Sequence, residues 1–120
     1  MIKTLRISRF KSIKELSLDC RRINIFIGEP NTGKSYILEA LGLLSFLGYS
    51  SEYGARDFLR FERTSNLFYD ESLERPLEIN CDSIALTIEF KDGRFRGVCN
   101  EGGGTGIAEL HGDHTKLNVR

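Results

Sequence analysis

The feature that most constrains this chain is a glycine-rich loop placed between a buried strand and a buried helix. Residues Ile23–Ile27 are almost continuously apolar, which is typical of a strand buried on both faces. Residues 36–47 are apolar nearly all round, which is typical of a buried helix. Between them lies G-x-x-x-x-G-K-[ST], which reads here Gly28-Glu29-Pro30-Asn31-Thr32-Gly33-Lys34-Ser35. The order of strand, loop and helix predicts a Walker A phosphate loop.

The residue types in this loop suit the binding of a phosphorylated ligand. Gly28 and Gly33 allow a sharp exit from the strand and a close approach of backbone to phosphate. Asn31 stands where many phosphate loops carry glycine, and asparagine tolerates the left-handed conformation that such a bend requires. We expect the Lys34 ammonium to face the β- and γ-phosphates as the candidate catalytic group, and the Ser35 hydroxyl to ligate Mg²⁺. The candidate nucleotide-binding residues are all the residues of the loop and Tyr36, which follows it.

Length and composition restrict the class of protein. The chain has 120 residues, of which 40% are hydrophobic and 28% charged, as in one globular domain or a piece of one. Its longest apolar run, Leu41–Leu47, is far shorter than the roughly 18 residues that a membrane span needs. Cys20, Cys81 and Cys99 show no Cys-x-x-Cys spacing, which argues against zinc or a disulfide framework. We expect a cytoplasmic protein without a membrane partner.

Charge is unevenly distributed along the chain, although the formal net charge is zero. Residues 1–40 hold eight Lys/Arg against four Asp/Glu, whereas residues 41–120 hold nine against thirteen. A basic first third suits an anionic ligand, but composition alone favours a solvated strand face.

Two strands are expected before the buried one. Apolar residues recur at close to period two in residues 2–10 and again in residues 16–20, and Lys11-Ser12-Ile13-Lys14 interrupts the pattern. We expect two antiparallel strands joined by a short turn.

Together these pieces resemble the N-terminal half of the ABC-type ATPase heads of the SMC, RecF and OLD group. Such heads begin with a strand, an F-K/R-S-like turn and a second strand, and only then enter the strand that leads to the phosphate loop. The matching sequences here are Leu5-Arg6-Ile7, Phe10-Lys11-Ser12, Leu16-Ser17-Leu18, Ile23–Ile27, the loop itself and Leu38-Glu39-Ala40-Leu41. The resemblance is specific over residues 1–48 and loose beyond them.

The resemblance implies a mixed α/β (α+β) fold of the P-loop NTPase type, with antiparallel strands, a central strand–loop–helix unit and a β-hairpin flap. It implies ATP and Mg²⁺ as cofactors and a homodimer of heads that encloses two ATP molecules. The intact protein would act in DNA maintenance or anti-phage defence, with nucleic acid as a partner. Arg9 and Lys11 lie where such heads contact ribose or base, although both also suit a charged surface beside a buried Phe10.

The resemblance also divides the chain. We expect strands, loop and helix in residues 1–48, a linker of helix and loop in residues 49–80, and an antiparallel hairpin region in residues 81–120. Within the linker, Ala55–Arg63 is expected to form a short helix with Phe58, Leu59 and Phe61 directed inward.

The hairpin region contains one clear hairpin and two sequences that could be mistaken for sites. Ile84–Phe90 alternates, Asp92-Gly93 is a favoured hairpin turn, and Phe95–Cys99 forms the returning strand. Residues 102–106 are expected to form a flexible loop, because no lysine and no buried strand accompany the glycines. The remaining candidates, expected at the surface rather than on a metal, are His111, Asp113 and His114.

Hydrolysis in such heads also needs a signature segment and a Walker B strand that ends in Asp-Glu. Leu67–Glu71 resembles Walker B, but it lies only about 30 residues after the loop and follows the polar Ser65 and Asn66. No Leu-Ser-Gly-Gly sequence occurs. We therefore expect the N-terminal part of a longer ATPase, which binds ATP but does not hydrolyse it efficiently by itself.

Two other functions stay open. One is a nucleotide-binding regulatory or assembly module that never hydrolyses ATP. The other is a phosphate-loop kinase or GTPase, against which the strands before the loop and the missing Asn-Lys-x-Asp sequence both count.

Overall fold

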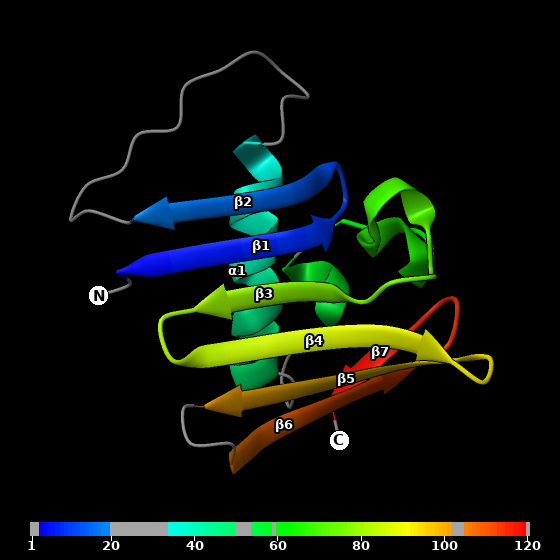
Figure 1. Cartoon of the computed structure of the whole chain (residues 1–120). Coiled ribbons are helices and arrows are strands. Elements are labelled where there is room, and N and C mark those ends of the chain that lie inside the picture. Colours follow the sequence, from blue (N-terminus) through cyan, green and yellow to red (C-terminus); the bar gives the residue numbers. More distant parts are fainter. Residues whose placement is uncertain (1–2, 20–33, 50–53, 59, 102–104, 120) are drawn as a thin grey trace.

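One antiparallel sheet is covered on one face by one long helix (Figure 1). The computed structural model describes residues 3–19, 34–49, 54–58, 60–101 and 105–119. The elements are β1 (Thr4–Phe10), β2 (Ile13–Asp19), α1 (Lys34–Tyr49), β3 (Leu77–Cys81), β4 (Ile84–Lys91), β5 (Arg94–Glu101), β6 (Thr105–Gly112) and β7 (Leu117–Val119). The strand order is β2-β1-β3-β4-β5-β6-β7.

The combination of helix and sheet agrees with the expected class, but every strand pair in the described sheet is antiparallel. Most neighbouring strands are joined by short turns, which can only connect antiparallel strands. The strand expected at Ile23–Ile27 lies outside the described residues, as does the loop at 28–33. The central strand–loop–helix unit therefore stays a prediction.

The N-terminal hairpin is confirmed. β1 pairs with β2 around the turn at Lys11-Ser12, which is shorter than the expected interruption at 11–14. The alternation of buried side chains along β1 shifts at Arg9, whose φ is 59°, so that Phe10 enters the core. Lys11 also has a left-handed φ, of 52°. Both conformations are unfavourable for residues other than glycine, so the surrounding contacts must stabilise this turn.

A short central strand occupies part of the expected linker. β3 pairs with both β1 and β4, through Ile79 with Ile7 on one side and with Leu86 on the other. Assigning residues 77–80 to the linker is therefore wrong. Leu77, Ile79 and Cys81 are buried and alternate with more exposed polar residues, but this pattern is short and directly follows the turn at Pro76.

The hairpin of β4 and β5 is confirmed. Asp92 and Gly93 have φ values of 54° and 79°, as the central residues of a type I′ turn require. β6 and β7 then extend the sheet. Thr105 and Gly106, expected in a flexible loop, belong to β6, and the rest of that loop lies outside the described residues.

The core lies between α1 and the facing side of the sheet. Ile37, Ala40, Leu43 and Phe46 of α1 are buried and recur every three residues, so they form one stripe of the helix. The buried side chains of the strands are Leu5, Ile7, Phe10, Leu77, Ile79, Cys81, Leu86, Ile88, Phe95, Cys99, Leu110 and Leu117.

The opposite face of the sheet carries exposed charged side chains such as Arg6, Glu78 and Arg96. Such a face is normal for an antiparallel sheet that is covered on one side. In the described part of the chain, no helix combines the length and the apolar character needed to cross a membrane.

The prediction of a helix over Ala55–Arg63 is wrong. Within this range, η1 (Ala55–Asp57) is one short 3₁₀ turn, and two more such turns follow it, η2 (Thr64–Leu67) and η3 (Tyr69–Glu71). Phe61 is buried and Phe58 half-buried, whereas Leu59 lies outside the described residues. A regular helix does not form because backbone groups of this segment bond to side chains: the Arg60 N–H donates to Glu39, and the N–H groups of Glu62 and Arg63 donate to the side-chain oxygen of Asn66.

The Walker B-like segment Leu67–Glu71 contains no extended strand. Asp70 and Glu71 have left-handed φ values of 54° and 53°, and both lie in the turn η3. Phe68 makes an isolated bridge to Phe10, which ties this segment to the end of β1.

Candidate functional site

The predicted phosphate loop meets the described structure only at its C-terminal end. Residues 28–33 lie outside the described residues, and so do the side chains of Lys34 and Ser35. The helix expected after the loop is confirmed, since α1 begins at Lys34. A helix directs its free N–H groups and the positive end of its dipole toward the residues that precede it. The N-terminal end of α1 therefore favours an anion bound at the residues that precede the helix in sequence.

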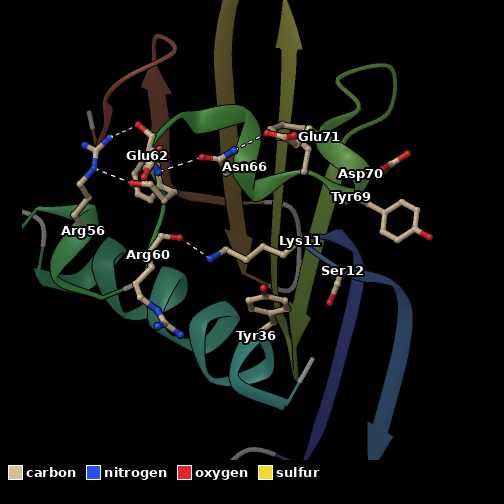
Figure 2. Close-up of a pocket in the computed structure, with 12 residues that line it drawn as sticks. Lys11, Ser12, Tyr36, Arg56, Arg60, Glu62, Asn66, Tyr69, Asp70 and Glu71 are labelled. Carbon is tan, nitrogen blue, oxygen red and sulfur yellow. Dashed lines mark hydrogen bonds between the residues drawn. The ribbon is translucent and has the colours of Figure 1, made fainter. Parts of the chain in front are cut away.

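A pocket of about 890 Å³ lies beside the first turn of α1 (Figure 2). Its walls come from the turn between β1 and β2 (Lys11 and Ser12), from Tyr36 of α1, and from side chains within residues 56–71. Tyr36 directly follows Ser35, so the pocket adjoins the end of the predicted loop. Its volume falls in the range of about 300–1,000 Å³ that is typical of small-molecule sites.

Lys11, Glu39 and the backbone of Arg60 are joined by hydrogen bonds on one side of this pocket, and we call this group the Lys11–Glu39 clamp. The Lys11 ammonium lies 2.8 Å from Glu39 Oε1 and also donates to the Arg60 carbonyl, a bond drawn in Figure 2. The Arg60 N–H donates to the same Glu39 oxygen at 2.7 Å. Both side chains of the ion pair are only 10% exposed. The clamp thus joins the β1–β2 turn, α1 and residue 60.

The two cations assigned to the site each lie over a tyrosine ring. Lys11 Nζ is 5.1 Å from the centre of the Tyr36 ring, and Arg9 Cζ is 5.4 Å from the centre of the Tyr69 ring. Tyr36 and Tyr69 line the pocket, whereas Arg9 does not. Arg9 therefore contacts a residue of the pocket wall without lining the pocket itself. Its buried Nε has no hydrogen-bond partner.

Hydrogen bonds hold the wall at residues 56–71 in place. The Arg56 guanidinium donates to the carbonyls of Phe61, Glu62 and Thr115, at 3.0, 2.9 and 2.7 Å. Asn66 accepts from the Glu62 N–H at 3.1 Å and donates to the Glu71 carboxylate at 2.6 Å. Figure 2 shows these side chains ranged along one side of the pocket. The pocket is thus preformed by contacts within the chain.

Sequence reasoning missed Glu39, Arg56, Arg60 and Tyr69 as parts of this region. Glu39 did carry a signal, because it is the one charged residue in the otherwise apolar stretch 36–47. A charge at such a position requires a partner on another element. The other three lie in a segment whose position depends on tertiary contacts.

The aspartates with perturbed pKa values lie away from the pocket. The N–H groups of Thr4 and Lys3 hold the pKa of Asp82 below its ordinary value of 3.8. The pKa of Asp113 is lowered by the N–H and hydroxyl of Thr115 and the N–H of Lys116. Burial raises the pKa of the Cys99 thiol.

Two of the polar candidates near the C-terminal end, Asp113 and His114, are engaged in contacts within the chain. The carboxylate of Asp113 is occupied by its own turn, and the His114 ring packs against Phe90 and Phe95. Among the residues that the structure describes, no group of three or more His, Cys, Asp or Glu side chains is arranged to hold a metal ion.

Comparison with known proteins supports a nucleotide-binding, ATPase-like function. Residues 1–100 match the family model described as AAA ATPase domain. A Methanocaldococcus jannaschii protein described as uncharacterized, MJECL10, is 34% identical over an alignment of 112 residues, and the match covers 79% of this chain. The match covers 49% of that relative, so this chain spans about half its length.

Proposed function

The chain belongs to the AAA ATPase domain family, and we propose that it binds ATP with Mg²⁺ through residues 28–35. The observation that carries the proposal is the complete phosphate-loop sequence, which ends where α1 begins. Lys34 would neutralise the β- and γ-phosphates, Ser35 would ligate the metal, and the helix dipole would favour the anion. Bound Mg²⁺ would supply charge neutralisation at the phosphates.

We propose that the pocket beside Tyr36 holds the nucleoside part of the ligand. With the phosphates held at the loop, the adenosine would extend toward Tyr36 and Tyr69, whose aromatic faces suit a base. Lys11 is 10% exposed and already bound to Glu39, so in this arrangement it shapes the pocket rather than contacting ribose or base directly.

For the full-length protein, the proposal extends to an ABC-type ATPase of the SMC, RecF and OLD kind. Such a protein would pair two heads around two ATP molecules and act on nucleic acid in DNA maintenance or anti-phage defence. This chain alone would bind ATP without efficient hydrolysis. Its one Walker B-like sequence, Leu67–Glu71, forms turns, which favours that reading.

Calorimetric titration with Mg-ATP and Mg-ADP tests the proposal. Replacing Lys34 with alanine removes a charge-assisted contact worth about 1.5–3 kcal/mol, so affinity should fall about tenfold to more than a hundredfold. Lys91→Ala is the matched control, because Lys91 is exposed at the far end of β4. Absence of saturable binding by the unmodified chain, or equal binding by Lys34→Ala, would refute the proposal.

A further inference from the structure

We infer that Glu39 is a positioning residue that sets the affinity for the nucleoside part of the ligand, through the Lys11–Glu39 clamp. This inference rests on the proposed binding of ATP at residues 28–35. It concerns a residue that belongs neither to the loop nor to the lining of the pocket.

The first argument is the burial of Glu39. Its side chain is 10% exposed on a helix whose neighbouring residues are apolar, so its charge must be neutralised by the protein. Lys11 supplies that charge at 2.8 Å. One carboxylate oxygen, Oε1, accepts both Lys11 and the Arg60 N–H, while the buried Oε2 has no partner. Such a costly arrangement is not what packing alone would select at a core position.

The second argument is which parts of the chain Glu39 connects. Lys11 belongs to the turn between β1 and β2, where it adopts a left-handed φ and its N–H also donates to the Leu67 carbonyl at 2.9 Å. Arg60 belongs to the wall made by residues 56–71. Glu39 holds both of them to α1, one turn beyond the predicted loop. These are the three segments that form the pocket.

The third argument is the position of Lys11 relative to Tyr36. The ammonium that Glu39 binds also lies over the Tyr36 ring, 5.1 Å from its centre. Loss of the carboxylate would remove the charge partner of Lys11 and leave the Arg60 N–H without its acceptor, so the link between α1, the β1–β2 turn and residue 60 would be weakened. The pocket wall would then have to become ordered when the ligand binds. This cost weakens binding of the nucleoside, which is the part of the ligand that contacts the wall. Phosphates bound only at the loop would not be affected.

The experiment compares two ligands on the 120-residue chain: Mg-ATP, and inorganic tripolyphosphate with Mg²⁺. We expect Glu39→Ala to weaken Mg-ATP about tenfold, the cost of ordering one to two long side chains, and to leave tripolyphosphate within about twofold. Glu39→Gln keeps an acceptor for the Arg60 N–H and should recover part of the loss. Glu89→Gln, on the exposed polar face of β4, is the control for removal of one negative charge.

The ratio of the two affinities separates a positioning role from a structural one, since partial unfolding would weaken both ligands alike. Equal weakening of both ligands, or no change in either, overturns the inference. If Glu39→Ala does not fold, Glu39→Gln, which keeps the size of the side chain and leaves no buried negative charge, must produce a smaller loss with the same selectivity for Mg-ATP. Binding of neither ligand by the unmodified chain would refute the proposed function itself, and this inference with it.

Discussion

At the scale of single residues, Asp82 fixes the start of the sheet. Its Oδ1 accepts the N–H groups of Lys3 and Thr4, each at 2.9 Å, and its own N–H donates to the Thr4 carbonyl. These bonds favour the charged carboxylate, so its pKa lies below the ordinary value of 3.8 in the folded state. The carboxylate therefore stabilises the fold at every pH above that ordinary value, and the contribution is lost as the pH falls through the lowered folded pKa.

We predict that Asp82→Asn destabilises the chain at neutral pH and that its difference from the unmodified chain shrinks below about pH 3.8. The amide still accepts a hydrogen bond but has no charge to lose. Urea denaturation midpoints at pH 6, 4 and 3 measure the difference, with the exposed Glu89→Gln as the control for charge. A difference that stays constant down to pH 3 would contradict this prediction.

Gly42 is a second residue whose role the structure defines. Glycine in the middle of α1 suggests close packing against the sheet, but the close neighbour is the backbone of Phe58: a Cβ at residue 42 would lie 2.7 Å from its carbonyl oxygen. We predict that Gly42→Ala destabilises the chain by about 1–3 kcal/mol, because this overlap outweighs the gain of about 1 kcal/mol in helix propensity. The change in unfolding free energy from urea titration measures it.

Gly54→Ala is the matched control for Gly42→Ala. A Cβ at Gly54 would meet no atom closer than the Asp57 carboxylate at 3.9 Å, so we expect a change of at most about 1 kcal/mol. Equal stability of the two alanine variants would mean that α1 does not approach residue 58 as closely as described.

At the scale of elements, the turns of residues 54–71 depend on their attachment to the β6–β7 connection. Thr64 is fully buried, its hydroxyl donates to the Asp113 carbonyl at 2.6 Å, and its N–H donates to the His114 carbonyl at 2.9 Å. Arg56 adds a bond to the Thr115 carbonyl. The wall of the candidate pocket is thus held from the far end of the sheet.

We predict that Thr64→Val, which keeps the shape of the side chain, destabilises the chain by about 1–3 kcal/mol because the Asp113 carbonyl loses its buried donor. Thr87→Val, half-buried on the polar face of β4, is the control and should change stability by no more than about 0.5 kcal/mol. Thermal and urea unfolding measure both. Thr64→Val as stable as Thr87→Val would show that this bond does not hold the turns.

The elements that could be predicted are those specified by local sequence. The β4–β5 hairpin follows from the alternation of Ile84–Phe90 and from Asp92-Gly93, whose positive φ values need no distant partner. The helix after the loop likewise follows from its apolar composition. β3 was not predictable, because only five residues alternate and their partners, β1 and β4, come from different parts of the chain.

The candidate site also has one part that could be predicted from the sequence, the loop, and one part that could not, the pocket. The loop sequence can be recognised from residues 28–35 alone, and it stays a prediction because most of it lies outside the described residues. The pocket could not be predicted, because Lys11, Glu39 and Arg60 meet only through tertiary structure. The spacing of Phe58 and Phe61 suggests a helix, but the segment that carries them consists of turns and irregular backbone, with Phe61 buried and Phe58 half-buried.

At the scale of the whole molecule, β3 joins two parts of the chain that are far apart in sequence. Leu5 pairs with Cys81 and Ile7 with Ile79, while β3 also pairs with β4. The N-terminal hairpin, which leads toward the predicted loop, therefore shares one continuous sheet with the C-terminal strands. α1 packs across this sheet and includes β1 among its neighbours (Figure 1). Such an arrangement favours unfolding of both hairpins together rather than one at a time.

We predict that backbone amides of β1 and β4 exchange with solvent through the same global opening, whereas those of the three-residue edge strand β7 exchange faster by local opening. Hydrogen exchange followed by NMR measures both. Ile79→Ala, which removes a fully buried side chain between β1 and β4, should lower the opening free energy of both strands equally, by about 2–5 kcal/mol. Protection lost in β1 but kept in β4 would mean that the N-terminal hairpin opens alone. The pocket wall at Lys11 would then be able to detach while the rest of the sheet stays folded.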